Sequence, residues 1–495
     1  MHTTLRRSCT ACAKSKFGCD LRTPRCSRCV KRKLLCHYAN EPLTATTSPV
    51  AAAPGMGAGG SEPGTWPAGD FTDSSNGLSS SSAAASSNSS SPIAYYSFGS
   101  VDPFNSCPPT RLPTAHVQRL VHAFLNKIAF QYYPLDLGTT TNPFLTSWWP
   151  LALGDPALFH VSLQTACLDE EYLAQRGFRS SDILMAESVA LLRRKIEDPS
   201  LAVQDGTMNS IITLAAIEFG KGHFATAKLH VDGVKRLVDM RGGIDSVRQT
   251  SPLTARMVSW VSMLVMGHPQ FQTQDDWGTG DGIPPIPEWQ LDNVAHHDDF
   301  AIAASGLAGA LNGDVQVKNV LMRLRNIFRR AQTTPLEPTR LHDLTSFVIH
   351  RLLSSKPGTG GDNGNNGNDP LAQSDPVTEC IRYATILYMF ILQGPTYYSH
   401  EHMMSAISFD LKEQLQLFSS GSEMDYSIHI WLLAVGMVAS TGSPNHGWFL
   451  EEARGLVSTL QIDGWQEVFD HIKSVLWLDL LHSEHVFQSH WRYIC

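Results

Sequence analysis

The chain has 495 residues, of which 42% are hydrophobic, and a formal net charge of −8. This length and apolar content are ordinary for a globular protein and allow a substantial core. No apolar stretch reaches the length needed to cross a bilayer, so we expect no membrane association. The sequence contains no G-x-S-x-G, Walker or H-E-x-x-H motif, and we therefore expect that the protein is not an enzyme.

The N-terminal segment contains six cysteines with regular spacing, C-x2-C-x6-C-x6-C-x2-C-x6-C. They are Cys9, Cys12, Cys19, Cys26, Cys29 and Cys36. Two intervening residues let both sulfurs of a C-x2-C pair point at one metal ion, and zinc takes four ligands in a tetrahedron. Six thiolates are too few for two separate four-ligand sites and too many for one. Two Zn²⁺ ions that share two bridging thiolates use all six, so the pattern predicts a binuclear zinc cluster.

Other uses of these cysteines fit the sequence less well. A disulfide scaffold requires an oxidising compartment, and no apolar run typical of a signal peptide follows Met1–Leu5. A redox C-x2-C is expected near a βαβ pattern, which the sequence lacks. A zinc module that binds protein rather than nucleic acid remains an alternative.

The N-terminal end is also strongly basic. Residues 1–40 contain ten Lys or Arg side chains and one acidic residue, Asp20, which gives a net charge of +9, so the other 455 residues carry −17. Part of this positive charge offsets the six thiolates, but ten basic residues exceed that need. A small basic end on a large acidic body is typical of a nucleic-acid-binding module attached to a regulatory domain.

The segment from Ser8 to Tyr38 resembles the Zn2Cys6 DNA-binding module of fungal transcription factors, in its cysteine spacing and in the position of Pro24. It is most similar to the aflatoxin-regulator subgroup of that family, whose members control secondary-metabolite gene clusters. The resemblance implies that Cys9 and Cys26 bridge the two metals. It also implies that Cys12 and Cys19 complete one zinc site, and that Cys29 and Cys36 complete the other.

The same resemblance implies which residues contact DNA. The stretch Ala13–Gly18 is expected to enter the major groove as a short helix. Lys16 lies four residues after Cys12, where the family places a lysine that contacts guanines in CGG-like triplets, and its ammonium group can donate to guanine O6 and N7. Six other basic residues are expected to contact the phosphate backbone: Lys14, Arg25, Arg28, Lys31, Arg32 and Lys33.

Residues 41–108 follow the module, for which we take the bounds 6–40, and are expected to form a disordered linker. Ser, Ala, Gly, Pro and Thr dominate this stretch, which has five acidic residues and no Lys or Arg. Such a composition buries too little apolar surface to offset the entropy of ordering. The linker has no heptad repeat, so the protein either binds DNA as a monomer or dimerises through the large domain.

Residues 109–495 show helical periodicity with few alternating strand patterns, and they predict an all-α domain. One apolar stripe runs from Val117 to Ile128 after Thr114, a candidate N-cap. A second runs from Ala227 to Val238 and is expected to stop at Gly242-Gly243, and a third runs from Val468 to Leu476. A polar insert near 355–376 is expected to be disordered.

This large domain is similar to the fungal-specific transcription factor regulatory domain. The resemblance rests on Asn142-Pro-Phe, Trp148-Trp149-Pro, His230-x2-Gly233, Arg241-Gly-Gly and Trp431-Leu-Leu. It implies an all-helical regulatory body that controls activity, binds effectors or partners, and sometimes self-associates. From the residues alone, we expect the tryptophans in the core and Arg241-Gly242-Gly243 at a helix C-cap.

One part of the large domain is acidic. Met257–Val317 contains eight acidic residues and no Lys or Arg, and within it Gln272–Phe300 mixes Asp side chains with Trp277 and Trp289. Acidic residues interleaved with aromatic ones suit an activation segment that binds a coactivator. A solvated, proline-punctuated loop is the interpretation that we prefer.

These patterns predict a nuclear, zinc-dependent DNA-binding transcription regulator of RNA polymerase II genes. We expect it to activate a secondary-metabolite gene cluster through CGG- or TCG-type half-sites. The expected partners are double-stranded DNA, coactivators and a second copy of the chain bound through the regulatory domain. The alternative is a zinc-cluster co-regulator that acts through protein contacts without reading DNA.

Overall fold

The computed structural model describes residues 10–15, 27–32, 107–175, 177–291, 314–354, 375–418, 424–480, 483–492 and 494. The expected linker lies outside these residues except for its last two positions, and the expected insert lies outside them as far as Ser374. Every regular element of the described residues is a helix, and their one β-type pairing is an isolated bridge between Thr273 and Ile283. The predicted small N-terminal module and large all-α domain are therefore confirmed.

The N-terminal module contributes two short helices, α1 (Thr10–Lys14) and α2 (Ser27–Lys31). The large domain begins with a first helix group: α3 (Thr114–Ala123), η1 (Phe124–Ile128), α4 (Ala129–Tyr132), η2 (Phe144–Trp148), α5 (Trp149–Gly154), α6 (Pro156–Ala174), α7 (Arg179–Glu197), α8 (Pro199–Ala202), α9 (Asp205–Gly220), α10 (Phe224–Met240), α11 (Ile244–Thr250) and α12 (Pro252–Met266). A short helix, α13 (Pro287–Gln290), comes next. The second helix group follows: α16 (Val315–Ala331), α17 (Pro338–Ser354), α18 (Pro376–Gln393), α19 (Glu401–Phe418), α20 (Tyr426–Ala439), α21 (His446–Leu460), α22 (Trp465–Val475) and α23 (Ser483–Trp491).

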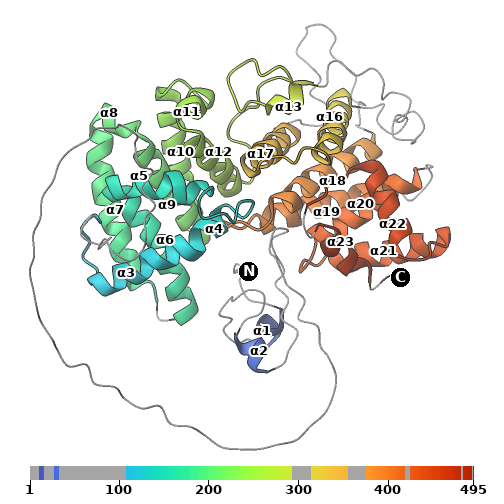
Figure 1. Ribbon diagram of the computed structural model, residues 1–495, viewed down its shortest axis with the longest axis horizontal. Helices are drawn as coiled ribbons and strands as arrows, with labels where there is room; N and C mark the ends of the chain where they lie inside the picture. Colours follow the sequence, from blue (N-terminus) through green and yellow to red (C-terminus); the bar gives the residue numbers. More distant parts are fainter. Residues whose placement is uncertain are drawn as a thin grey trace, which may run out of the picture. The chain divides into compact units, whose positions relative to one another are not determined.

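Four helices of the large domain are buried on nearly all sides: α6 and α9 in the first group, and α18 and α20 in the second. A helix that is apolar all round must be covered by others. In the first group α7, α10 and α12 pack on α6 and α9, and in the second group α17, α19, α21 and α22 pack on α18 and α20. Figure 1 shows the two groups side by side.

The three predicted apolar stripes form the buried faces of α3 with η1, of α10 and of α22. Gly242 and Gly243 follow α10 with φ of +91° and +95°, a region that favours glycine. Two details of the prediction were wrong. Thr114 is the first residue of α3 and not its cap, because Pro113 takes the N-cap position. Leu476 is buried but lies beyond the end of α22.

Aspartates cap several helices with their side chains. Asp155 accepts from backbone N–H groups at the start of α6, Asp314 at the start of α16 and Asp425 at the start of α20. Asp375, which we placed in the disordered insert, accepts from Thr378 N and caps α18. The expected insert therefore ends before Asp375, because the carboxylate satisfies a backbone donor that the helix leaves open.

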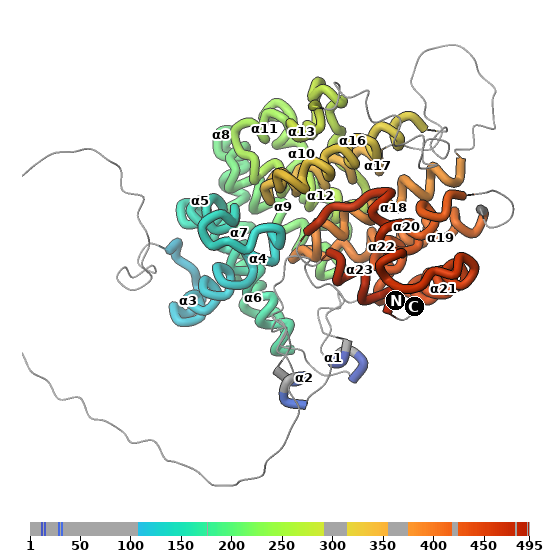
Figure 2. The backbone as a smooth tube through the Cα atoms, turned by 45° about the vertical axis from the view of Figure 1, so that its right-hand side comes forward, coloured from blue at the N-terminus to red at the C-terminus, as the bar shows by residue number. Residues whose placement is uncertain are grey.

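The two helix groups meet at α12 and α17, which lie side by side in Figures 1 and 2. Arg256 of α12 donates two hydrogen bonds to Asp343 of α17, Nε to Oδ1 at 2.6 Å and Nη2 to Oδ2 at 2.8 Å. Such a bidentate pair fixes orientation as well as distance. We call this contact region the group interface.

Aromatic residues extend the group interface. Tyr132 stacks on Tyr397, with ring centroids 5.0 Å apart, and its hydroxyl lies 2.6 Å from that of Tyr398. Tyr397 Oη donates to the Thr165 carbonyl of α6 at 2.9 Å, across 232 residues of sequence. The ring of a buried tyrosine of this kind packs against apolar neighbours, and its hydroxyl makes a hydrogen bond.

The acidic segment that we compared with an activation segment is folded into the body over residues 272–291. Trp289 is fully buried and its Nε1 donates to Asp276 Oδ1 at 3.2 Å. Asp276 also pairs with Arg351 of α17 at 2.9 Å and accepts from Asn319 of α16 at 3.1 Å. We call this set of contacts the Asp276 clasp.

The clasp corrects part of each interpretation of this stretch. Residues 272–286 form an irregular, proline-containing loop with many exposed residues, as we preferred, but Trp289 is buried and Asp276 is held by contacts with the body. Trp277, with 61% of its surface exposed, keeps the expected exposure. The remaining residues of the stretch, from Asp292 to Phe300, lie outside the described part of the chain.

Of the helices that the structure describes, none combines the length and the apolar character required to cross a bilayer. The interior is not wholly apolar, however. Three histidines are buried near the group interface, His342 and His350 on α17 and His400 just before α19. Burial lowers the pKa of each to about 4, because desolvation disfavours the charged imidazolium.

These histidines predict a stability that falls in mild acid. The ordinary histidine pKa of the unfolded chain is about 6.5, so below that value the unfolded state binds more protons and is favoured. The free energy of unfolding should fall by roughly 1 kcal/mol per buried histidine between pH 7 and about pH 5.5. Chemical denaturation of the full chain across this pH range measures the effect.

His400→Phe is the variant that checks the cause. His400 stacks on Phe390 with ring centroids 4.9 Å apart, and its Nδ1 has no hydrogen-bond partner among the described residues. Phenylalanine should keep the packing and remove one titrating group, so the variant should lose less stability in acid than the parent. An unchanged pH dependence would remove His400 from the explanation.

Candidate zinc centre and nucleic-acid interface

The two described helices of the N-terminal module are equivalent in length and in register. Each has five residues, each begins directly after the first cysteine of a C-x2-C pair, and each carries the second cysteine at its third position. Cys12 therefore occupies the same place in α1 that Cys29 occupies in α2. The structure thus repeats the half-pattern that the sequence contains twice.

The sulfur-bearing residues of these helices lie in a shielded environment. Cys12 and Cys29 are fully buried, and the helices that carry them are in contact. Arg28 Nη1 of α2 donates to Cys12 Sγ of α1 at 3.7 Å. The guanidinium therefore links one C-x2-C half to a cysteine of the other half.

This environment fits the implied zinc ions. Thiolate sulfur is a preferred zinc ligand, and hydrogen bonds to metal ligands hold them in place and tune them. An arginine donor beside Cys12 would balance part of the negative charge that thiolates bring. Among the described cysteines, none forms a disulfide with Cys12 or Cys29. The other four predicted ligands, Cys9, Cys19, Cys26 and Cys36, lie outside the described residues, and within those residues no three potential ligands converge.

The structure describes four of the predicted DNA-contacting residues. Lys14, Lys31 and Arg32 are exposed at the C-terminal ends of α1 and α2, where cationic side chains also interact favourably with the helix dipole. Arg28 is half-buried against Cys12. Lys16, Arg25 and Lys33 lie outside the described residues.

Sequence reasoning missed the contact between Arg28 and Cys12. We predict a phosphate contact for Arg28, and in the structure its guanidinium also faces a predicted zinc ligand. The signal that could have found it is its position next to Cys29 in α2, since α1 and α2 are related by the sequence repeat and must face each other around a shared cluster.

The residues that we singled out in the body have structural roles. Trp148 is buried and donates from Nε1 to Ser162 Oγ at 2.9 Å, while Trp149 is half-buried and stacks on Phe124. Arg241 pairs with Asp205 at the start of α9 at 2.5 Å, a role beyond the expected C-cap. Burial lowers the pKa of His230, so that its imidazole is neutral near pH 7.

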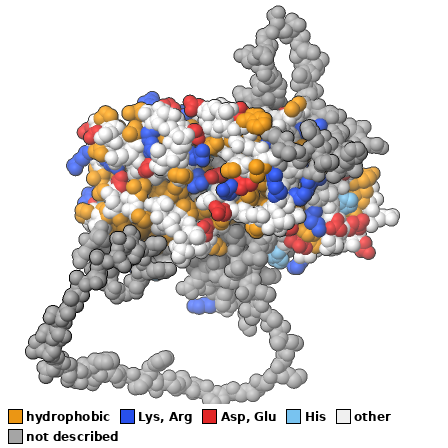
Figure 3. Space-filling view, turned by 45° about the horizontal axis from the view of Figure 1, so that its top comes forward, with side chains coloured by type: hydrophobic (Ala, Val, Ile, Leu, Met, Phe, Trp, Pro, Cys, Tyr) orange, Lys and Arg blue, Asp and Glu red, His pale blue; other side chains and the backbone are white. Residues whose placement is uncertain are grey.

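Two body cysteines, Cys167 and Cys380, are buried. Desolvation raises the pKa of the Cys167 thiol, and it raises that of Cys380 to about 12. Since the thiolate is the reactive form, both side chains are inert at neutral pH. On the face of the body drawn in Figure 3, Lys and Arg side chains are interspersed with Asp and Glu. That face therefore lacks the single-sign basic patch that nucleic acid requires.

Comparison with protein families agrees with this division of the chain. Residues 7–45 match the fungal Zn(2)-Cys(6) binuclear cluster domain, and residues 119–451 match the fungal specific transcription factor domain. The second match covers well over half of the chain. The first implies zinc binding, and both domains occur in transcription factors rather than in enzymes.

Comparison with individual proteins gives a shorter match. The chain is similar to the aflatoxin biosynthesis regulatory protein of Aspergillus parasiticus and to the same protein from a particular strain of that species. Each is 39% identical in an alignment of 64 residues, and the match covers 11% of this chain and 14% of the relative. The chain thus aligns with about a seventh of the length of these relatives. No solved structure matches.

The buried cysteine pair, the six-cysteine spacing and the helical body all agree with the two matched domains. The resemblance that the sequence suggested is thereby confirmed, including the likeness to a regulator of the aflatoxin type. The chain belongs to the fungal transcription factors that join a Zn2Cys6 binuclear cluster to a fungal specific transcription factor domain.

Proposed function

We propose that the chain is a nuclear, sequence-specific DNA-binding regulator of RNA polymerase II transcription that activates a secondary-metabolite gene cluster. The observation that carries the proposal is the repeated half-module, in which Cys12 and Cys29 are buried while Lys14, Lys31 and Arg32 are exposed. The shielded sulfur side serves metal binding and the exposed basic side serves phosphate binding. The name of the similar regulator supports the pathway-specific role.

The zinc centre supplies the folding energy that so small a module lacks. A segment of about forty residues buries too little apolar surface to fold alone, and small metal domains gain their stability from the bound metal. We assign Cys9 and Cys26 as bridging ligands, with Cys12 and Cys19 completing one site and Cys29 and Cys36 the other. Arg28 then has a supporting role, since it orients Cys12.

The DNA contacts divide into two kinds. Lys16, two residues after the end of α1, is assigned to guanine in a CGG- or TCG-type half-site. Lys14, Lys31 and Arg32, with Arg25 and Lys33, are assigned to phosphates, which position the module but carry no sequence information. Pairing of two copies through the body would raise the local concentration of the second module at a paired half-site. Coactivators are the proposed partners for activation.

Selection from a random duplex pool tests the DNA function. The zinc-loaded full chain should enrich a CGG- or TCG-containing motif, and the enrichment should vanish in chelator because the module unfolds without metal. Sequencing of the bound duplexes measures it. Enrichment that persists in chelator contradicts the proposal, and a zinc-loaded chain that enriches nothing favours the co-regulator that acts through protein contacts.

Lys16→Ala and Lys31→Ala separate the two kinds of contact. Loss of Lys16 should cost about 1–3 kcal/mol on the preferred site and relax the preference for it. Loss of Lys31 should weaken binding to all duplexes alike and reduce the slope of log affinity against log salt by about 0.9. Binding isotherms at several salt concentrations measure both. Lys228→Ala, at an exposed lysine of α10, is the matched control and should change neither quantity.

Metal content tests the ligand assignment. Cys9→Ser should disturb both zinc ions, since a bridging thiolate belongs to both, whereas Cys12→Ser should affect one site more than the other. Elemental analysis of the purified full chain gives zinc per protein for each variant. A Cys9→Ser protein that loses one zinc and firmly retains the other contradicts the bridging role.

A further inference from the structure

The two helices of the N-terminal module carry residues of the same kind at four of their five positions. The corresponding pairs are Thr10 with Ser27, Cys12 with Cys29, Ala13 with Val30, and Lys14 with Lys31. At the second position α1 has Ala11, whereas α2 has Arg28. The repeat is therefore broken directly before the second cysteine of each C-x2-C pair.

The arginine at this position contacts the opposite helix. Arg28 Nη1 donates to Cys12 Sγ at 3.7 Å, a separation that the large radius of sulfur allows. Cys12 is fully buried and Arg28 is half-buried, so the bond is partly shielded from water, and a charged donor acts more strongly in such surroundings. Ala11 has only a methyl group and cannot donate the equivalent bond to Cys29.

A hydrogen bond of this kind bears on metal retention. A thiolate that binds zinc carries negative charge, and a donor beside it stabilises that charge and keeps the sulfur aimed at the metal. Arginine suits this role because its charge is permanent and its N–H groups are fixed in a plane. Lys14 and Lys31 are exposed, so water screens their charges more than it screens the charge of Arg28.

We propose that Arg28 is a positioning residue for one half of the zinc centre. Its bond to Cys12 strengthens the hold of Cys12 and Cys19 on zinc. Cys29 and Cys36 gain no such support from it. The inference rests on the proposed zinc ligands, and it adds that two halves with the same cysteine spacing differ in their dependence on one side chain.

Alkylation at each cysteine tests the proposal. The zinc-loaded full chain is mixed with a limiting amount of chelator and N-ethylmaleimide, and mass spectrometry follows the four cysteines that are not assigned as bridges. In Arg28→Leu, which removes every N–H donor of the side chain, alkylation of Cys12 and Cys19 should be about tenfold faster than in the parent. Alkylation of Cys29 and Cys36 should stay close to its parent rate, and it serves as the internal control for folding.

Two further variants separate hydrogen bonding from packing. Arg28→Lys keeps a cation and should restore part of the protection of Cys12. Ala11→Arg places a guanidinium at the equivalent position of α1 and should slow the alkylation of Cys29. A side chain that only filled space would give neither result. Alkylation of Cys29 at the parent rate in Ala11→Arg would contradict the action of the guanidinium through the neighbouring thiolate.

Cobalt(II) in place of zinc gives a second readout. Charge transfer from thiolate to cobalt absorbs in the near ultraviolet, and a hydrogen bond to the sulfur moves this absorption to shorter wavelength because it lowers the energy of the sulfur electrons. The band of Arg28→Leu should therefore lie at longer wavelength than that of the parent, with Arg28→Lys between them. A band that does not move in Arg28→Leu overturns the hydrogen bond to the metal ligand.

The zinc content of the parent distinguishes this inference from the function on which it rests. If the parent binds zinc and Arg28→Leu exposes all four cysteines equally, or none of them, the selective role of Arg28 alone is overturned. A parent that binds no zinc overturns the proposed zinc centre, and the inference with it.

Discussion

The fold of the body depends on one constraint: α6, α9, α18 and α20 are buried on nearly every face, so other helices must cover them. The pairs α6 with α9 and α18 with α20 each require a set of surrounding helices, and the two sets meet at the group interface. The meeting place cannot be as apolar as the centres, because its edges reach solvent. Polar side chains gather there, and they are satisfied by pairing, as Arg256 with Asp343 and Tyr397 with the Thr165 carbonyl.

The same constraint explains why histidines lie inside. Burial disfavours an unpaired charge, so Arg382 is buried with Glu379 on α18, and a neutral imidazole can be buried while it still makes a hydrogen bond. His342 Nδ1 lies 2.7 Å from Gln393 Nε2, and His350 Nδ1 lies 2.7 Å from the Ser346 carbonyl. The first contact joins α17 to α18, and the second lies within α17. Protonation of His342 removes the acceptor that Gln393 uses, and protonation of any of the buried histidines places a charge in the interior, so the stability of the body depends on pH.

The sequence predicted the parts of this protein that depend on local patterns. Cysteine spacing predicted the zinc module, and apolar periodicity predicted α3, α10 and α22, because both are read within a few turns of chain. The sequence did not predict the Asp276 clasp, in which residues 276, 289 and 351 meet only after α17 has packed. Composition gave Gln272–Phe300 the character of an exposed acidic segment, yet the positive charges that neutralise Asp276 come from helices that follow it in the sequence.

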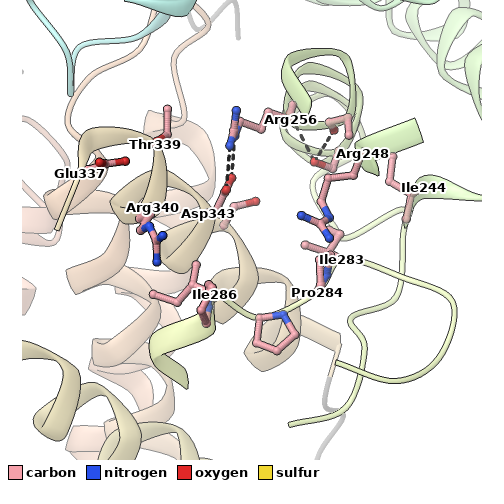
Figure 4. A pocket seen from close by; sticks show the side chains of 15 residues that line it. Ile244, Arg248, Arg256, Ile283, Pro284, Ile286, Glu337, Thr339, Arg340 and Asp343 are labelled. Carbon is pink, nitrogen blue, oxygen red and sulfur yellow. Dashed lines mark hydrogen bonds and ion pairs between the residues drawn. The ribbon is translucent and has the colours of Figure 1, made fainter. Parts of the chain in front are cut away.

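The two modules of the chain are stabilised by different interactions, so different changes destabilise them. Metal ligands decide whether the N-terminal module folds, whereas packing and buried polar pairs decide whether the body does. A pocket lined by α11, α12 and α17 lies where the two helix groups of the body meet (Figure 4).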